Sequence, residues 1–260
     1  MASHILYEVD DGVATITIDR AEKKNAMTYA MLGNFIEVVR RAGGDPNARV
    51  VILTGVPGAF CAGTDLADLA TIPGGERGLR GEAEDRDRWW PLVECPKPVI
   101  AAVDGPAVGM GAEFTSQCDI RVATANARFA WNFAHRGLVP DTGAGSWLLP
   151  RLIGPAKAMR LLYTGEFLSA EEALNIGYVD TVVAPEVLQD EVRKLAAAIA
   201  KASPFSHARI KKLVYEGLGS DVGGHMQRHT QALAECFKSY DHQEGVAAFL
   251  ERREAKFTGT

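Results

Sequence analysis

Residues 98–119, PVIAAVDGPAVGMGAEFTSQCD, combine a buried strand, a glycine-rich turn and the start of a helix in immediate succession. The strand is predicted over residues 99–103, because they are apolar on both faces. Residues 104–106, Asp-Gly-Pro, end it. The turn that follows connects the strand directly to the helix, and the ends of strands are where ligands bind in α/β sheets.

The helix start within this stretch has unusual chemistry. Gly109 and Gly111 flank Met110, and Glu113 follows one turn later. Backbone N–H groups at a helix start lack partners within the helix and favour negative charge. One interpretation is therefore an anion-stabilising backbone beside an acid or base. The alternative is a strand-to-helix turn that needs glycine only for packing.

Composition narrows the class of protein. The chain has 260 residues, 47% hydrophobic and 23% charged, and its net charge is −5 with no long basic run, which argues against nucleic acid as a partner. We see no signal peptide and no apolar run near the ~20 residues of a membrane span, so we expect a cytoplasmic protein with no membrane partner. The cysteines at 61, 95, 118 and 236 show no paired spacing, so we expect reduced thiols and no metal site.

Local patterns predict alternating strands and helices. The predicted elements are a hairpin over residues 5–18, a helix capped by Thr28 and ended at 43–44, strands at 50–53, 120–123 and 178–183, a helix at 155–162 and a helix opened by a Ser169–Glu172 capping box. The strands at 50 and 99 each run into a glycine-containing turn. This weak internal similarity suggests that similar structural units stack and bring two strand ends to one cleft.

Two further segments have plain interpretations. Residues 71–88 are polar, glycine-rich and densely charged, which favours a solvated loop over a flap above a site. Trp89 and Trp90 follow, and we assign this pair to core or interface. From about residue 186 the pattern is helical only, and a helical tail of this length needs its own core or a neighbouring subunit to pack on.

Three blocks of sequence resemble the crotonase family, the enoyl-CoA hydratases and isomerases. They are AFCAGTDL at Ala59–Leu66, PVIAAVDGPAVGMGAEF at Pro98–Phe114, and the long block Gly137–Asp180. The likeness covers nearly the whole chain, and the Pro140-Asp141 pair is most similar to the phenylacetate-pathway-type isomerases.

The resemblance implies an α/β fold, a crotonase-like spiral of ββα units over residues 1–200. A helical trimerisation region over 201–260 belongs to the same fold unit. It also implies a homotrimer or a hexamer built as a dimer of trimers. The substrate class is an acyl-CoA thioester, and no cofactor is expected because coenzyme A is part of the substrate.

The resemblance further implies an oxyanion hole made by two backbone N–H groups. Matched to this sequence, the donors are Ala62 and Met110. Neighbouring glycines, Gly63 among them, keep side chains away from both donors. Such a hole holds the thioester oxygen while it becomes an enolate.

The family's hydratases activate water with two glutamates. Glu113 occupies the first of these positions, but Phe133 occupies the second and cannot titrate, which makes ordinary water addition doubtful. Asp141 is the other candidate. We expect Asp141, or Glu113, to remove a proton from one carbon and return it to another, with a pKa raised by apolar neighbours. The structural alternatives are a turn residue for Asp141 and a helix-start charge for Glu113.

Contacts to the substrate are also implied. Lys23 lies where the family's first loop passes the CoA adenine, and two tail residues match positions that contact the CoA of a neighbouring subunit. For Asp65 we favour a helix-capping or turn role, and we treat Trp131 as pocket wall. The predicted substrate- and CoA-binding set is Lys23, Ala59, Gly63, Asp65, Leu66, Gly109, Trp131, Phe133, Phe249 and Arg252.

Four functions stay open at this point. The first is an isomerase that moves a double bond in an acyl-CoA. The second is a hydratase in which Asp141 replaces the missing glutamate. The third is hydrolysis or dehalogenation through an ester on Asp141. The fourth is a catalytically silent acyl-CoA-binding protein. The acyl chain and the choice between trimer and hexamer are also open.

Overall fold

The structure is a computed structural model that describes residues 4–71 and 90–260. Its main sheet has the strand order β1-β2-β3-β4-β6-β9. These strands are β1 (Ile5–Asp10), β2 (Val13–Ile18), β3 (Val50–Gly55), β4 (Val99–Val103), β6 (Ile120–Thr124) and β9 (Thr181–Val183). Among the described strands of this sheet, β1 and β2 pair antiparallel and the other neighbours pair parallel.

A second, three-stranded sheet has the order β5-β7-β8, with β5 (Pro106–Val108), β7 (Arg128–Ala130) and β8 (Leu168–Ser169). The chain runs from β4 into β5 and then into α4 (Met110–Gln117), which makes one strand–strand–helix unit. The α/β class expected from the sequence is confirmed. The turn after the buried strand crosses from one sheet to the other before the helix begins.

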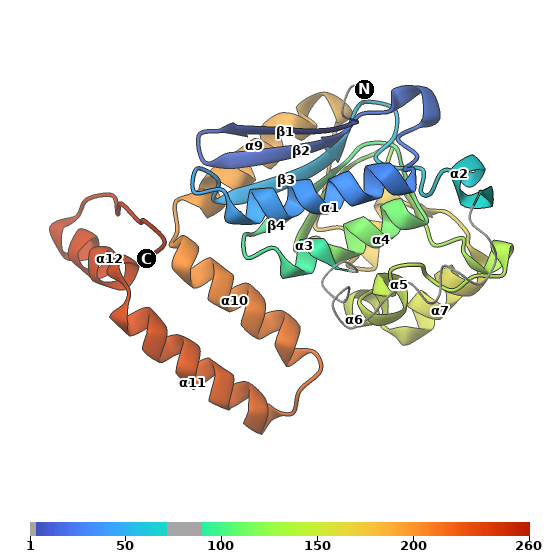
Figure 1. The fold of residues 1–260 in the computed structure, drawn as a ribbon. Coiled ribbons are helices and arrows are strands. Elements are labelled where there is room, and N and C mark those ends of the chain that lie inside the picture. The colour runs from blue at the N-terminus through green and yellow to red at the C-terminus, as the bar shows by residue number, and fades with distance from the viewer. Residues whose placement is uncertain (1–3, 72–89) are drawn as a thin grey trace.

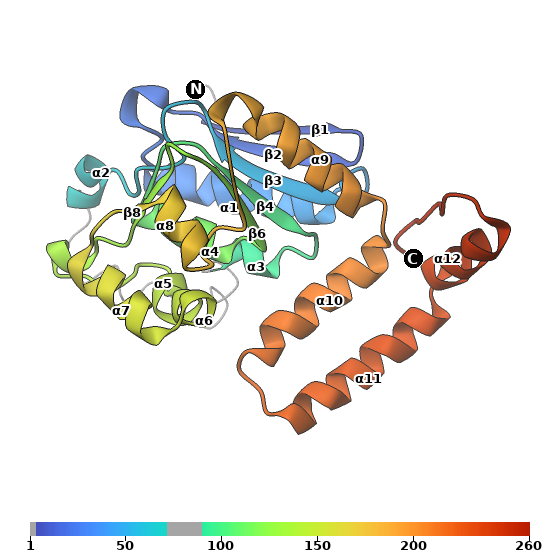
Figure 2. The same cartoon turned by 180° about the vertical axis from the view of Figure 1, so that it is seen from behind.

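Helices cover both faces of the main sheet (Figures 1 and 2). On one face, Val50, Ile52 and Ile100 pack with α9 (Leu188–Ala200). On the other face, the alternate residues of the same strands pack with α1 (Tyr29–Gly44) and α4. Burial on both faces is the reason that these strands are continuously apolar in the sequence.

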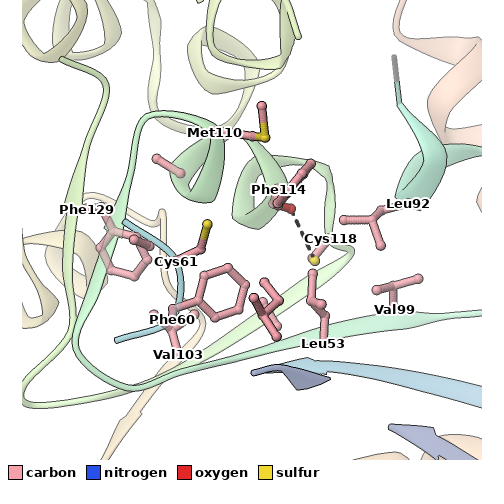
Figure 3. Close-up of a cluster of buried hydrophobic side chains, with 14 of the residues drawn as sticks. Leu53, Phe60, Cys61, Leu92, Val99, Val103, Met110, Phe114, Cys118 and Phe129 are labelled. Carbon is pink, nitrogen blue, oxygen red and sulfur yellow. Dashed lines mark hydrogen bonds between the residues drawn. The ribbon is translucent and has the colours of Figure 1, made fainter. Parts of the chain in front are cut away.

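Helix α4 is enclosed by the rest of the fold. All eight of its residues are buried, which is unusual for a helix that carries Glu113 and Gln117. Phe114 on α4 belongs to the same buried cluster as Phe60 and Leu53 (Figure 3), and its ring centroid lies 4.6 Å from that of Phe35 on α1. This packing fixes the position of the helix start, and with it the first amides of α4.

Short-range signals predicted the local structure well. Asp11 and Gly12 form the hairpin turn with φ of 46° and 76°. The Thr28 hydroxyl accepts from the Met31 N–H and caps α1. Ser169 and Glu172 form the predicted capping box at the start of α8 (Ala170–Asn175). These parts of the prediction are confirmed.

The predicted strand at 178–183 is shorter in the structure, because β9 begins only at Thr181. Tyr178 is fully buried, and its hydroxyl bonds those of Thr115 and Ser116 at 2.7 and 3.1 Å. Its carbonyl accepts from the Arg121 guanidinium. These long-range contacts turn the chain inward where the sequence pattern indicated a strand.

The remaining short elements connect the layers. They are η1 (Ala21–Lys23), α2 (Leu66–Ala70), α3 (Pro91–Glu94), η3 (Ala134–Arg136), α5 (Ala144–Trp147), α6 (Leu149–Ile153), α7 (Pro155–Thr164) and η4 (Pro185–Val187). The loop predicted over residues 71–88 and the tryptophan at 89 lie outside the described residues, apart from residue 71. All four cysteines are unpaired, as predicted. Within residues 4–71 and 90–260, no helix is both long and apolar enough to cross a membrane.

Three helices form an arm that projects from the body: α10 (Pro204–Gly217), α11 (Val222–Lys238) and α12 (Tyr240–Glu251) (Figures 1 and 2). Helix α9 ends at Ala200 and α10 begins at Pro204. Arg49 ties the end of the chain back to the body, because its guanidinium donates to the carbonyls of Ala200 and Phe257 at 3.1 and 2.7 Å.

Candidate active site

Two glycine-containing turns lie side by side at the ends of β3 and β4. The N–H groups of Phe60 and Cys61 donate to the carbonyl of Pro106 at 3.0 and 3.1 Å, and the N–H of Val108 donates to the carbonyl of Cys61 at 2.9 Å. The first turn therefore pairs with β5, the strand that leads into α4. The expectation that two strand ends meet is met by this backbone pairing.

Glycines allow this close approach. A Cβ on Gly111 would lie 2.2 Å from the carbonyl oxygen of Cys61, and a Cβ on Gly63 would lie 2.8 Å from that of Val108. The same point on Gly63 lies 3.6 Å from the backbone nitrogen of Met110, and Gly63 also has φ of +96°. Side chains are excluded from the space between the two turns, as the sequence predicts.

The prediction that Ala62 supplies an oxyanion donor is wrong. Its N–H donates to the carbonyl of Lys24 at 3.0 Å, so this amide is already used. The carbonyl of Gly63 and the N–H of Asp65 both bond to Met27, which leaves the N–H of Thr64 pointing away from that segment. The Thr64 N–H makes no hydrogen bond with any other described residue.

The backbone N–H of Met110 is placed as a predicted oxyanion donor needs to be, at the start of a helix. Met110 is the first residue of α4, and the first intrahelical bond runs from the N–H of Glu113 to the carbonyl of Gly109 at 3.0 Å. Within the described part of the chain, the Met110 N–H has no acceptor. The positive end of the helix dipole adds to its attraction for a negative oxygen.

Glu113 lies fully buried on α4. The Thr142 hydroxyl donates to its Oε2 at 2.7 Å, while its Oε1 has no partner among the described residues. Burial raises the pKa of Glu113 to about 7, partly offset by Thr142 and by the amides of Gly145 and Ala144. A Cβ on Gly145 would lie 2.3 Å from Oε1, so only glycine fits there.

Asp141 directly precedes Thr142, whose hydroxyl contacts Glu113, so the chain brings Asp141 to the same region as Glu113. Burial raises the pKa of Asp141 to about 6, opposed by the Thr142 N–H, by its own N–H and by the Thr64 hydroxyl. Its Oδ1 is buried without a hydrogen-bond partner in the described structure. The structure thus brings together the two predicted carboxylates and the turn that contains Thr64.

The raised pKa of Glu113 predicts how stability depends on pH. Between about pH 4.5 and about pH 7 the folded state binds a proton that the unfolded state has lost, so stability falls as pH rises and levels off above pH 7. We expect Glu113→Gln, which has no charge to bury, to be more stable than the native chain at pH 8 by on the order of 3 kcal/mol and nearly equal to it at pH 4.5. Urea unfolding at both pH values, at fixed protein concentration, measures this. Equal stability of Glu113→Gln and the native chain at pH 8 would contradict the prediction that folding buries a charge on Glu113.

Aromatic side chains make the apolar wall. Trp131 and Phe129 are fully buried and Phe133 nearly so. The Trp131 ring meets that of Tyr178 edge-on at a centroid distance of 5.1 Å, and its indole Nε1 is buried without a partner among the described residues. Phe133 borders the second turn, because its Cζ lies 3.8 Å from where a Cβ on Gly109 would be.

Other predicted residues surround the first turn. Ala59 is buried, and its carbonyl accepts from the Asn25 amide at 2.7 Å. Asp65 caps α2 through the Ala67 N–H at 2.9 Å and pairs with Arg20 at 2.8 Å. The capping role favoured for Asp65 is confirmed.

The remaining predicted residues lie on the surface. Leu66 is half exposed, and Lys23 is exposed on η1. Phe249 is 83% exposed on α12, and Arg252 is the exposed residue that ends this helix. Both views place α12 far from α2, so within one chain these two residues lie apart from the site (Figures 1 and 2).

Sequence reasoning missed Thr64 and Thr142. Thr64 follows Gly63 in the first block, and Thr142 follows Asp141 directly, so proximity to predicted residues was the available signal. Neither side chain has a distinctive spacing. Gly145 was missed as well, although its missing side chain makes room for Glu113.

Comparison with known proteins agrees with this fold. The model of the enoyl-CoA hydratase/isomerase family matches residues 8–260. A probable enoyl-CoA hydratase of Rhodobacter capsulatus is 38% identical over 259 residues, 98% of each chain. A 1,2-epoxyphenylacetyl-CoA isomerase of Escherichia coli is 38% identical over 265 residues and covers both chains fully. The crystal structure of an enoyl-CoA hydratase from Bacillus anthracis superimposes with a TM-score of 0.91 at 31% identity, covering 99% of this chain and 100% of that one.

The fold is thus that of the crotonases, as the sequence predicts. The chain belongs to the enoyl-CoA hydratase/isomerase family and is an enzyme. Relatives of similar identity carry the names of both hydratases and an isomerase, so the family alone does not select the reaction.

Proposed function

We propose that this enzyme is an enoyl-CoA isomerase that moves a double bond in an acyl-CoA thioester by proton transfer. The observation that carries this proposal is a pair of buried carboxyl groups, Glu113 and Asp141, whose pKa values are raised to about 7 and about 6 beside unoccupied backbone amides. Two buried carboxyl groups whose pKa values are raised toward neutrality suit an acid and a base that work near neutral pH.

The amides of Thr64 and Met110 form the oxyanion hole in this proposal, with Thr64 in place of Ala62. Support comes from the engaged amide of Ala62 and from the glycines that separate the two turns. The thioester oxygen gains negative charge when the enolate forms, so both donors bind the transition state more tightly than the substrate. Each such donor is typically worth ~10²–10³ in rate.

The proton transfer follows from the two carboxyl groups. With a 3-enoyl-CoA, the Asp141 carboxylate takes a proton from C2, and the electrons of that C–H bond delocalise into a dienolate held by the two amides. The Glu113 carboxyl then donates a proton to C4, which leaves the double bond between C2 and C3. Proton exchange between the two carboxyl groups, or with solvent, restores the starting state.

Hydration of a 2-enoyl-CoA is the second candidate. It is favoured by relatives named as hydratases, such as the crotonyl-CoA hydratase of Syntrophomonas wolfei at 36% identity. Against it stands Phe133, which lies where the resemblance implies a second water-activating glutamate. Asp141 would have to take over that role.

Two assays with the full chain separate the candidates. We expect a 3-enoyl-CoA to gain the absorbance of a conjugated thioester and crotonyl-CoA to be left largely unhydrated. Hydration of crotonyl-CoA faster than conversion of the 3-enoyl-CoA would overturn the isomerase assignment in favour of a hydratase. A covalent adduct on Asp141 in the mass spectrum would indicate ester chemistry instead. Tight binding without turnover of any thioester would indicate a silent binding protein.

We also propose that the chain assembles as a trimer, or as a hexamer of two trimers. In support, α11 has no buried residue although it is 17 residues long. Large apolar side chains on the arm are exposed, among them Val222, Phe249 and Leu250 at 74% or more. In such an assembly Phe249 and Arg252 would serve the CoA of a neighbouring copy, and an Arg suits a phosphate well.

A further inference from the structure

Thr142 bonds to neighbouring segments through both its hydroxyl and its carbonyl. Its hydroxyl oxygen receives the N–H of Ala144 at 3.3 Å and the side-chain amide of Gln117 at 3.4 Å. The same hydroxyl donates to Oε2 of Glu113 at 2.7 Å. The carbonyl of Thr142 accepts from the indole N–H of Trp90 at 2.8 Å. This bond connects the Thr142 segment to the start of α3.

The hydroxyl of a threonine has one proton and two lone pairs. The two N–H donors take up the two acceptor sites of the Thr142 oxygen, which leaves no place for a third donor. The proton in the short contact with Glu113 is therefore the threonine's own. It follows that Oε2 of Glu113 accepts a hydrogen bond whether or not the carboxyl group is protonated.

We propose that Thr142 is a positioning residue that keeps Oε2 of Glu113 as an acceptor and leaves Oε1 as the oxygen that carries and transfers the proton. The inference rests on the proposed function, in which Glu113 is the acid of the pair. The role proposed here belongs to the Thr142 hydroxyl, which acts through Glu113.

The surroundings of Oε1 agree with this role. Oε1 is buried and has no partner among the described residues. A Cβ on Gly145 would lie 2.3 Å from Oε1 and 2.9 Å from Cδ1 of Trp131, so the missing side chain leaves Oε1 uncovered on this side. Among the described residues, Asp141 is the charged group whose ionisation raises the pKa of Glu113. Thr142 opposes that effect, because its hydrogen bond favours the charged form.

Two variants of Thr142 separate the hydroxyl from the shape of the side chain. Thr142→Val keeps the shape and removes the hydroxyl, and Thr142→Ser keeps the hydroxyl. The carbon-13 signal of the Glu113 carboxyl, assigned by its loss in Glu113→Gln, is followed against pH in the full chain. We expect the midpoint of Thr142→Val to rise by about one unit over the native chain and that of Thr142→Ser to stay near it. Equal midpoints for Thr142→Val and the native chain would overturn the proposal.

Infrared difference spectra below the pKa identify the protonated oxygen. If Oε1 carries the proton, the C=O bond of the acid is the one that accepts from Thr142, so its stretching band moves to higher frequency in Thr142→Val. An unmoved band would place the proton on Oε2 and contradict the inference. Neither readout needs turnover, so a failure of the isomerase assays and a failure of the role of Thr142 are told apart.

Discussion

Asp141→Asn and Glu113→Gln are each expected to lower kcat by about 10²–10⁴ in the double-bond shift, because each removes a group that transfers a proton in the transition state. The amides that replace the carboxyl groups keep shape and hydrogen bonding but cannot titrate near neutral pH. Steady-state kinetics with a 3-enoyl-CoA, with protein concentration and fold checked by circular dichroism, measures the effect. KM is expected to change much less than kcat, since neither group holds the coenzyme A.

Asp190→Asn on the exposed first turn of α9 is the matched control, because it removes a carboxylate remote from the site. Full turnover of both Asp141→Asn and Glu113→Gln would show that the acid–base assignment is wrong. The dependence of activity on pH gives a further check of the two roles. With Asp141 as base, activity falls below about pH 6, and with Glu113 as acid, it falls above about pH 7. Each variant is expected to lose its own limb.

Met110→Pro is the second change with a large expected effect. Proline removes the backbone N–H, and at the first position of a helix that N–H has no partner in the helix, so α4 is expected to survive. The preceding Gly109, with φ of 53° and ψ of −119°, has the mirror image of the extended backbone that proline favours before it. We expect kcat to fall by about 10²–10³.

Thermal unfolding of Met110→Pro is followed in parallel, because a large loss of stability would make the kinetic result a folding effect. Met110→Leu keeps the amide and changes the side chain, so we expect it to lose far less activity than the proline variant. Equal losses for the two variants would indicate that the side chain, and not the N–H, is what the reaction needs.

Much of the fold follows from local signals in the sequence. The apolar runs at 50–53 and 99–103 are adjacent parallel strands, with Ile52 opposite Ile100. Thr28 and Ser169 cap the helices predicted from them. These features succeed because periodicity, caps and turn residues act over a few residues, which a single sequence records directly.

The parts that failed depend on distant segments. Which amide of the first turn is free depends on Lys24 and Met27, whose carbonyls accept from Ala62 and Asp65. The inward turn at Tyr178 depends on hydroxyls that lie more than 60 residues earlier in the chain. The environment of Glu113 depends on Thr142, 29 residues later. No local pattern encodes these contacts, although the two carboxylates themselves were found by matching the blocks of the family.

A crystal structure of the full chain with a bound acyl-CoA, or with a non-reactive enolate analogue, tests the oxyanion hole itself. We predict the thioester oxygen within ~3 Å of the backbone nitrogens of both Thr64 and Met110, with Asp141 and Glu113 facing C2 and C4. An oxygen that lies beyond hydrogen-bond distance of either nitrogen, with the acyl group elsewhere, would contradict the proposed mechanism as a whole.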